Sequence, residues 1–559
     1  MEFCIDPAVP TYAGGLGILA GDTIRTAADL GLSAAGVTLL HRRGYFHQQL
    51  DSEGNQSESD ALWSPEEFLE KLPLRVQVTV AERQVQVQAW RYLVRSESGH
   101  SVPVYFLDTC VPENGPWDQT LTDYLYGGDA RYRLGQEVIL GFAGVAILRA
   151  VGHPVVQAYH MNEGHSALVA LALLEEQTWG CGLHAIEPAD REGVSQRCVF
   201  TTHTPLPVGH DEFPIDLCRE VLGNERTNFL IESQCCCNGV LNMTNLALNF
   251  SRYVNGVSIR HEEVTRNVFS NHYIDAITNG VHAVTWTSPA FRQLYDRFIP
   301  QWRRDNLYLK YAIRIPLDEI WKAHTEAKQE LLTEVERRTS MHLDPKIMTI
   351  GFARRAAEYK RHDLLFHDLE RLKLIVQRGW RLQIIYGGKA HPRDETSKAL
   401  IRKVFEAANT LNNCIPVVYL EEYGVALAKY VCSGVDLWLN TPQKPREASG
   451  TSGMKAALNG VPTFSILDGW WIEGHVEGVT GWSIGDGWQS ETNVETEVAS
   501  LYDKLERVIV PMYYEQPNQF ASIMRSAIAL NGSYFNTQRM VTQYLQNAYL
   551  PHNDWHNNE

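Results

Sequence analysis

The sequence predicts an α/β protein of two doubly wound domains that face a cleft. Short apolar runs, typical of buried parallel strands, alternate with helical segments through most of the chain. Glycine-rich or basic loops follow several of these runs, at the strand ends where open parallel sheets bind ligands. The chain has 559 residues, too many for one hydrophobic core. We expect an N-terminal domain over 1–285 and a C-terminal domain over 286–559.

The composition narrows the class of protein. Hydrophobic residues make up 44% and charged residues 21%, as in an ordinary soluble globular protein. The formal net charge of −16 argues against a general surface for nucleic acid or anionic membrane. No apolar run reaches the ~18 residues of a membrane span, the first residues lack a signal-peptide pattern, and the 10 cysteines show no metal spacing. We therefore expect a cytoplasmic protein that binds no metal, nucleic acid or membrane.

The chain opens with a glycine loop. Tyr12–Gly17 reads YAGGLG and precedes a segment of helical period that ends at Gly31. Gly14, Gly15 and Gly17 thus lie before the start of a helix, where backbone amides can approach an oxyanion. A plain tight turn is the alternative interpretation of such a loop.

Alternating and helical patterns follow in the N-terminal half. Residues 75–110 alternate apolar and polar and predict antiparallel strands, whereas 134–151 and 165–176 predict helices. The segment 242–264 predicts two helices joined by a turn at Asn255-Gly256. A strand that begins at residue 274 reaches Asn279-Gly280. A simple turn at this Asn-Gly pair is the alternative to a binding role for Asn279.

Two histidines lie at predicted strand ends. The run VVQAYHMNEGH gives a strand and then a polar turn from Asn162 to His165. His203 follows the short strand Val199–Thr202. For each histidine, a structural hydrogen bond is the alternative to a role in binding.

The C-terminal half contains a cluster of cations. Ile347–Phe352 predicts a buried strand, and Arg354, Arg355, Lys360 and Arg361 come directly after it. A solvated helix face is the ordinary explanation for such a cluster. The position past the carboxyl end of a strand instead indicates a phosphate site.

A second strand and loop lead to an unusual lysine. The apolar run Val435–Leu439 predicts a strand, and a loop over 441–452 leads to a short helix, Met454–Leu458, that ends at Asn459-Gly460. Lys455 lies in the first turn of that helix, where the helix dipole favours negative charge. A solvated surface lysine is the alternative, but the setting between two buried strands favours a lysine that forms a Schiff base or contacts a phosphate.

These stretches resemble the α-glucan phosphorylases, the family of the glycogen, starch and maltodextrin phosphorylases. EASGTSGMKAALNG, followed by LDG, resembles their pyridoxal-phosphate loop, in which the lysine at the position of Lys455 carries the cofactor. YAGGLGILAGD resembles their glycine loop, and FARRAAEYKR resembles their segment VKRIHEYKR. Gly453 stands where many members have asparagine, and Arg354 where many have lysine. Because the resemblance begins at Met1, we expect a short form that lacks the usual N-terminal region.

The resemblance implies a role for each matched residue. His203 would position the glucosyl unit, and Lys389 would be a cation outside the direct contacts of the site. The implied catalytic residues are Lys455, Arg355, Lys360 and His203; those that bind the cofactor are Lys455, Arg354, Tyr359, Gly450, Thr451 and Gly15; and those that bind substrate are Gly14, Gly15, Asn279, Glu447, Ser449, Gly450 and His165.

The reaction that the resemblance implies is phosphorolysis with retention. Inorganic phosphate would attack the terminal glucosyl unit of an α-1,4-glucan (glycogen, starch or maltodextrin) and release glucose 1-phosphate. The 5′-phosphate of pyridoxal 5′-phosphate on Lys455 would act as the proton shuttle. The architecture would be that of GT-B glycosyltransferases, two Rossmann-like domains with the last helix, near 533–549, crossing back to the first. A homodimer is the assembly considered.

Two other functions are considered. A nucleotide-sugar glucan synthase has the same expected fold, but such enzymes place a second glutamate eight residues after the first. Here Lys455 stands eight residues after Glu447, and a cation suits a cofactor phosphate better than a ribose diol. A non-catalytic glucan-binding relative is the second alternative, because fold does not imply function.

Overall fold

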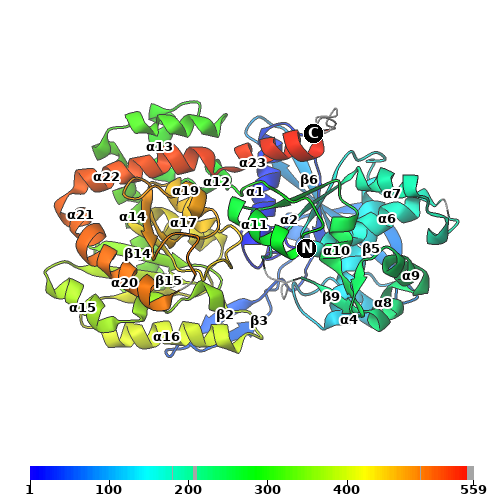
Figure 1. The fold of residues 1–559 in the computed structure, drawn as a ribbon, viewed down its shortest axis with the longest axis horizontal. Coiled ribbons are helices and arrows are strands. Elements are labelled where there is room, and N and C mark those ends of the chain that lie inside the picture. The colour runs from blue at the N-terminus through cyan, green and yellow to red at the C-terminus, as the bar shows by residue number, and fades with distance from the viewer. Residues whose placement is uncertain (179, 206–209, 492, 551–559) are drawn as a thin grey trace. The chain divides into compact units, whose positions relative to one another are not determined.

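The chain folds into two compact units in the computed structural model (Figure 1). The residues that it describes are 1–178, 180–205, 210–491 and 493–550. The first unit comprises Met1–Phe46, Asp60–Ile277 and the chain from Val541 on; the second comprises His47–Ser59 and Thr278–Met540. Helix α23 (Thr537–Tyr544) leads the chain back from the second unit to the first. The domain bounds expected from the sequence, 1–285 and 286–559, stay a prediction.

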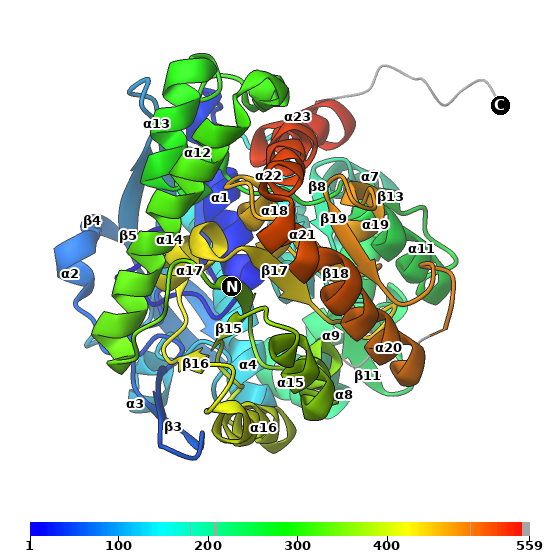
Figure 2. The ribbon, with the colours of Figure 1, turned by 90° about the vertical axis from the view of Figure 1, so that its left-hand side faces the viewer.

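The second unit is built on one six-stranded parallel sheet. Its order is β16-β15-β14-β17-β18-β19, which is the 3-2-1-4-5-6 order of doubly wound folds when the strands are counted along the chain. Helices α14 and α17 lie on one side of this sheet, and α15 and α16 on the other (Figure 2). The predicted α/β class is confirmed, and the strand order of this sheet is that of a doubly wound fold.

Buried apolar runs form the strands of this sheet. Every residue of β14 and β15 is buried, as expected for strands that helices cover on both faces. The strands of the unit are β2 (His47–Leu50), β3 (Gln56–Ser59), β14 (Met348–Ala353), β15 (Leu382–Gly387), β16 (Val417–Leu420), β17 (Leu437–Asn440), β18 (Thr463–Ile466) and β19 (Gly481–Ile484). Its helices are α12 (Ala283–Trp286), α13 (Pro289–Phe298), α14 (Leu317–Thr339), α15 (Leu369–Gln377), α16 (Glu395–Leu411), α17 (Val425–Gly434), α18 (Ser452–Ala457), α19 (Trp471–Gly474), α20 (Val494–Lys504), α21 (Val510–Glu515) and α22 (Pro517–Ser526).

The first unit differs from the single doubly wound sheet that was expected. Its parallel sheet, β13-β12-β8-β7, follows the chain order without the reversal that defines a doubly wound sheet. A separate mixed sheet, β1-β6-β5-β4, contains the antiparallel strands predicted over 75–110, and β1 pairs with β6 in parallel. Strand β5 pairs with the other edge of β6, and β4 pairs with β5.

The elements of the first unit vary in length, from the two-residue strand β10 to the 15-residue helix α1. Its strands are β1 (Gly36–Leu39), β4 (Glu70–Val80), β5 (Arg83–Arg95), β6 (Ser101–Asp108), β7 (Tyr159–Asn162), β8 (Cys198–Thr201), β9 (Glu212–Pro214), β10 (Cys236–Cys237), β11 (Val240–Asn242), β12 (Tyr253–Gly256) and β13 (Asp275–Ala276). Its helices are α1 (Gly15–Asp29), α2 (Pro65–Phe68), α3 (Pro116–Gln119), α4 (Ala130–Val138), α5 (Gly144–Ala150), α6 (Leu168–Gln177), α7 (Pro188–Ser195), α8 (Ile215–Leu222), α9 (Asn224–Glu232), α10 (Met243–Asn249) and α11 (Ile259–Val268).

The predicted turn at Asn255-Gly256 is wrong. Both residues lie in β12, which pairs in parallel with β8 and β13. The side chain of Asn255 accepts a hydrogen bond from Thr201 Oγ1 and donates one to Tyr544 Oη. These tertiary partners hold the backbone extended, so the local turn preference of Asn-Gly does not decide the structure.

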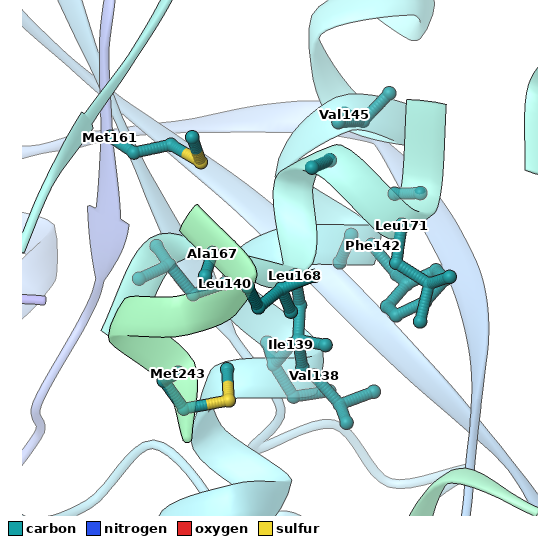
Figure 3. Close-up of a cluster of buried hydrophobic side chains, with 14 of the residues drawn as sticks. Val138, Ile139, Leu140, Phe142, Val145, Met161, Ala167, Leu168, Leu171 and Met243 are labelled. Carbon is teal, nitrogen blue, oxygen red and sulfur yellow. The ribbon is translucent and has the colours of Figure 1, made fainter. Parts of the chain in front are cut away.

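A close helix contact lies in the core of the first unit. A π-helical turn, Ile139–Ala143, joins α4 to α5. Its side chains pack against Leu168 and Leu171 of α6 (Figure 3). A Cβ at Gly141 would lie 2.7 Å from Leu168 Cβ, so only glycine permits this approach. Met161 of β7 and Met243 of α10 belong to the same cluster, which therefore supports the strand that ends at Asn162.

Neither a membrane span nor a metal cluster is found in the part of the chain that the structure describes. None of its helices there is both long and apolar enough to cross a bilayer. Nor do three or more His, Cys, Asp or Glu side chains gather there in a way that could hold a metal ion.

A buried ionic cluster holds α14 against the sheet of the second unit. Asp436 Oδ1 lies 2.8 Å from His324 Nε2, and its Oδ2 accepts hydrogen bonds from Lys328 Nζ at 2.6 Å and from Thr349 N at 2.7 Å. His324 and Lys328 are four residues apart and share one face of α14. Burial alone would raise the pKa of Asp436, but Lys328 and His324 hold that pKa below its ordinary value.

Replacing Asp436 with alanine should destabilise the second unit by about 3–5 kcal/mol, because it leaves the buried Lys328 ammonium without its carboxylate. Urea unfolding followed by tryptophan fluorescence measures this loss. The double variant Asp436→Ala/Lys328→Met should recover a large part of the loss, because no charge then stays buried. A double variant that is no more stable than Asp436→Ala would contradict this explanation.

Candidate functional site

The carboxyl edge of the six-stranded sheet gathers the residues expected to bind phosphate. Strands β14 and β17 are neighbours, and the strand order reverses between them. Ligands of doubly wound folds bind at such a reversal, outside the carboxyl ends of the strands. Arg354 follows β14 directly, and Asn440 is the last residue of β17. The fold thus brings the basic loop and the loop that leads to Lys455 to one edge.

A buried ion pair joins these two loops. Arg354 Nη2 donates to Glu447 Oε2 at 2.5 Å, and Arg354 Nη1 donates to Asn440 Oδ1 at 3.1 Å. Lys360 Nζ lies 3.7 Å from the same Glu447 oxygen. Burial would raise the pKa of Glu447, but Arg354 and Lys360 hold it below its ordinary value. Among the described residues the buried Nε of Arg354 has no hydrogen-bond partner, so this guanidinium retains a donor for an anion.

Lys360 and Tyr359 extend this cluster. Burial, with help from the nearby Arg354 charge, lowers the pKa of Lys360 to about 7, and Glu447 only partly offsets the shift. Lys360 Nζ lies 5.2 Å from the centroid of the Tyr359 ring. Burial and the Glu447 charge raise the pKa of that phenol. Arg355 is exposed. A hydrogen bond from Arg355 to Tyr359 lowers the pKa of the phenol and so offsets part of that rise.

The loop from Glu447 to Thr451 is held by the segment after β18. Asp468 Oδ2 accepts from Glu447 N at 2.9 Å, and Trp470 N donates to Ser449 O at 2.9 Å. Gly450 has a φ of 72°, a conformation that a side chain would strain. These contacts fix the backbone of Ser449, Gly450 and Thr451, which leads directly into α18.

Lys455 is buried on α18, which spans Ser452–Ala457 and not the predicted Met454–Leu458, so Lys455 lies in the last turn of the helix rather than the first. Its Nζ lies 4.0 Å from the centroid of the Trp286 ring, within cation–π range. Asn459 fixes this arrangement, because its Nδ2 donates to the backbone oxygens of Trp286 and Lys455 and its Oδ1 accepts from Ser288 N. A lysine this deeply buried is not the solvated surface residue of the alternative interpretation.

The glycine at position 453 has a packing reason. A Cβ there would lie 2.7 Å from Trp470 Cζ2 and 2.9 Å from Thr463 Oγ1. The Trp470 ring thus occupies the space that a larger residue at position 453 would need.

Asn279 is the second residue of Thr278–Met540, the longer of the two segments that form the second unit. It is buried, and its side-chain oxygen has no hydrogen-bond partner among the described residues. Its backbone oxygen accepts from Arg539 Nη2 at 2.9 Å, which fixes the main chain. The amide is thus held in place with an acceptor unused by the described part of the protein.

In the first unit, His203 and the turn after β7 form a second cluster. His203 Nε2 lies 2.6 Å from Asn162 Oδ1, and His203 N donates to Glu163 Oε2 at 2.8 Å. Burial lowers the pKa of His203 to about 3, so the ring is neutral near pH 7, and the tautomer with its proton on Nε2 donates to Asn162 Oδ1. Glu163 also accepts from Thr204 Oγ1 at 3.1 Å and from Gly164 N at 3.2 Å.

Glu163 is strained as well as buried. Its φ of 79° and ψ of 163° lie in a region that is nearly restricted to glycine. Burial raises its pKa to about 7, and three hydrogen bonds from the protein only partly offset that effect. Strain of this kind persists where the surrounding structure enforces it, and such residues cluster at functional sites.

The glycine loop and His165 also lie in the first unit. Helix α1 begins at Gly15, so Gly15 and Gly17 are inside it rather than before it. The N–H of Gly14 donates to Glu2 Oε2 at 3.1 Å and that of Ile18 to Gly14 O at 3.3 Å, so only the amides of residues 15–17, in the first turn of α1, can approach an anion. His165 is buried, with Nε2 2.6 Å from the amino group of Met1. The sugar-binding roles of Gly14 and His165 stay predictions.

Comparison with known proteins agrees with this geometry. Residues 224–555 match the family described as carbohydrate phosphorylase. The chain is 39% identical to the maltodextrin phosphorylase of Thermococcus litoralis, in a match that covers 98% of this chain and 70% of that protein. The chain belongs to the carbohydrate phosphorylase family. Glycogen phosphorylases of Aquifex aeolicus (34% identical, 98% of this chain and 85% of that protein) and Mycobacterium tuberculosis (32%, 99% and 70%) are further members.

The predicted resemblance to this phosphorylase family is therefore confirmed, and with it the enzyme class of glycosyltransferases. The individual site assignments stay predictions, although the structure brings several of the residues together in two clusters. Lys360, Arg354 and Glu447 meet in the second unit, and His203 meets Asn162 in the first.

Sequence reasoning assigned no role to three residues that hold the candidate site together. Asn440 binds Arg354, Asp468 holds the Glu447 loop, and Glu163 anchors the backbone of His203. Asp468 was within reach, because it is the aspartate of the LDG that follows the lysine loop. Asn440 carries no local signal, since only the pairing of β14 with β17 brings it to Arg354.

The raised pKa of Glu163 predicts a pH dependence of stability. A folded pKa of about 7 against an ordinary value of 4.5 means that the native carboxyl binds its proton more tightly than the unfolded one. The contribution of Glu163 to the free energy of unfolding should therefore fall by about 3 kcal/mol as pH rises through that range. Glu163→Gln should remove this part of the slope, as measured by urea unfolding at a series of pH values.

Glu192→Gln serves as the control, because Glu192 is exposed and its variant should keep the wild-type slope. Equal slopes for wild type and Glu163→Gln would show that the carboxyl is not held as described.

Proposed function

We propose that the protein is an α-1,4-glucan phosphorylase, which uses inorganic phosphate to release glucose 1-phosphate from terminal glucosyl units with retention. The observation that carries the proposal is the buried cluster of Arg354, Lys360 and Glu447 beside the loop that leads to the buried Lys455. The relatives named maltodextrin and glycogen phosphorylase support the same substrate class.

The residues present suit pyridoxal 5′-phosphate. Lys455 offers a buried primary amine for the aldehyde, and Trp286 provides an aromatic face beside it. The buried Nε–H of Arg354, without a partner among the described residues, offers a charged donor for a phosphate. When bound, the cofactor would supply a 5′-phosphate able to exchange a proton with the substrate phosphate. The other proposed contacts to it come from Tyr359, Gly450, Thr451 and Gly15.

The cations of the basic loop have distinct proposed tasks. Arg355 and Lys360 bind the substrate phosphate, and Arg354 faces the phosphate of the cofactor. Because two phosphates side by side repel each other, several cations must surround them. The lowered pKa of Lys360 puts part of its population in the neutral form near pH 7, so a bound phosphate dianion would restore its charge.

Several polar groups are proposed to contact the sugar. His203 is oriented by Asn162 and Glu163, so that its backbone carbonyl and neutral ring can contact the glucosyl unit as positive charge develops at C1. Asn279 has a buried amide oxygen available for a hydroxyl group. Further proposed contacts to substrate come from Gly14, Gly15, His165, Glu447, Ser449 and Gly450.

The two alternative functions are less well supported. A nucleotide-sugar synthase would need a carboxylate for the ribose at the position of Lys455, where this chain has a buried cation. A non-catalytic glucan-binding relative would have no need for the charged cluster around Glu447, which is costly to bury. We further propose the GT-B architecture; a cytoplasmic location and a homodimer stay predictions.

An absorbance spectrum and a product assay test the proposal. Purified wild type should show a pyridoxal band and release glucose 1-phosphate from maltodextrin and phosphate, and Lys455→Ala should lose both, because the cofactor has no other attachment point. Lys403→Ala, at an exposed position of α16, is the control and should keep both.

Glucosyl transfer from a nucleotide sugar, without a pyridoxal band, would replace this proposal by the synthase. A band without turnover on any glucan would favour the non-catalytic relative.

A further inference from the structure

A hairpin from the N-terminal half of the sequence is part of the second unit. Strands β2 and β3 pair antiparallel over His47–Ser59, and this segment belongs to the unit that otherwise begins at Thr278. Gln48 and Gln56 are buried, and Gln48 Nε2 donates to Gln56 Oε1 at 2.8 Å. Buried amides of this kind need several partners, and these two find them on the second unit.

The two glutamines hold the backbone of the loop after β15. Gln48 Nε2 donates to Gly388 O at 2.9 Å. Gln56 binds Ala390 twice, since its Nε2 donates to Ala390 O and its Oε1 accepts from Ala390 N, each at 2.9 Å. A residue whose N–H and C=O are both held by one side chain has little freedom to shift.

The hairpin also fixes the end of β16. Gln48 N donates to Glu422 Oε2 at 2.6 Å, and Gln48 Oε1 accepts from Glu422 N at 3.0 Å. The other carboxylate oxygen of Glu422 accepts from Lys389 Nζ. Lys389 thus lies between two backbone positions that the hairpin binds, Gly388 and Ala390.

The loop held in this way supports the basic loop directly. Arg354 N donates to Gly387 O at 3.0 Å, and Ala356 N donates to Lys389 O at 2.9 Å. A Cβ at Gly388 would lie 1.9 Å from Arg354 O, so the two backbones are in direct contact. The backbone on each side of Arg355 is therefore placed by residues 387–389.

We propose that Gln48 and Gln56 are positioning residues for the anion site of the basic loop. They act through the main chain of Gly387–Ala390 on Arg354 and Arg355, and they touch neither substrate nor cofactor. The proposal rests on the function proposed above, in that the anion is inorganic phosphate. It assigns to a hairpin some 300 residues away in sequence the task of setting phosphate affinity.

Gln48→Met and Gln56→Met test this role, because methionine keeps the length of the side chain and removes its hydrogen bonds. Each variant should raise the KM for phosphate about tenfold, since misplaced cations bind a small anion less well. The KM for maltodextrin should stay within about twofold of wild type, because the hairpin belongs to the second unit and the His203 cluster to the first. Gln56→Glu retains the acceptor for Ala390 N and should lie between wild type and Gln56→Met.

Gln49→Met is the matched control. Gln49 follows Gln48 in β2. Its side chain therefore points to the opposite face of the hairpin from Gln48, and it is exposed. Its variant should keep the wild-type KM for phosphate. If the Gln48 and Gln56 variants lose thermal stability but match Gln49→Met in the KM for phosphate, the glutamines are merely structural and the proposal is wrong.

A binding measurement separates this inference from the proposed function. Added phosphate should raise the midpoint of thermal unfolding of wild type and of Gln49→Met, and raise that of Gln48→Met and Gln56→Met less. This result would support the positioning role even if no glucan were cleaved. Equal phosphate-induced shifts in all four proteins would overturn it, whereas a wild type that binds phosphate without releasing glucose 1-phosphate would count against the proposed function alone.

Discussion

The buried ion pair between Arg354 and Glu447 constrains how the strands and loops of the second unit are arranged. Removing two charges from water is costly, and their mutual attraction offsets the cost only when the geometry is good and the remaining polar atoms are satisfied. Asn440 provides one further partner, and Lys360 provides a second cation near the same carboxylate oxygen. Each of these groups comes from the end of a strand or from the loop that follows it. The pair therefore requires that β14 and β17 be neighbours, with their carboxyl ends at one edge.

Support for this pair extends outward through backbone contacts. Asp468 holds the N–H of Glu447, and the loop after β15 holds the N–H of Arg354. The hairpin that carries Gln48 and Gln56 in turn holds that loop. The arrangement fits a site for small, highly charged anions, because rigid placement of cations matters more for such ligands than adaptable surfaces do.

The first unit has a different electrostatic character. Its cluster contains the neutral His203 and the carboxyl group of Glu163. That carboxyl group accepts hydrogen bonds from backbone N–H and hydroxyl donors. Such a cluster can orient an uncharged sugar, and a carboxylate there would also favour positive charge in a reacting glucosyl unit. The charges of the two clusters therefore suit different ligands: the cations of the second unit suit a phosphate, and the neutral and acidic groups of the first unit suit an uncharged sugar.

Local sequence determined much of this protein. Continuous apolar runs predicted the parallel strands, because a strand covered on both faces has no polar side. The loop around Lys455 was sufficient to indicate the family. Tertiary structure alone decided that Asn255-Gly256 forms a strand, that the hairpin at His47–Ser59 belongs to the second unit, and that Asn440 and Arg354 meet. The physical reason is that periodicity and turn preference act over a few residues. Pairing between distant strands, and the partners of buried polar groups, depend on contacts between segments that no local pattern encodes.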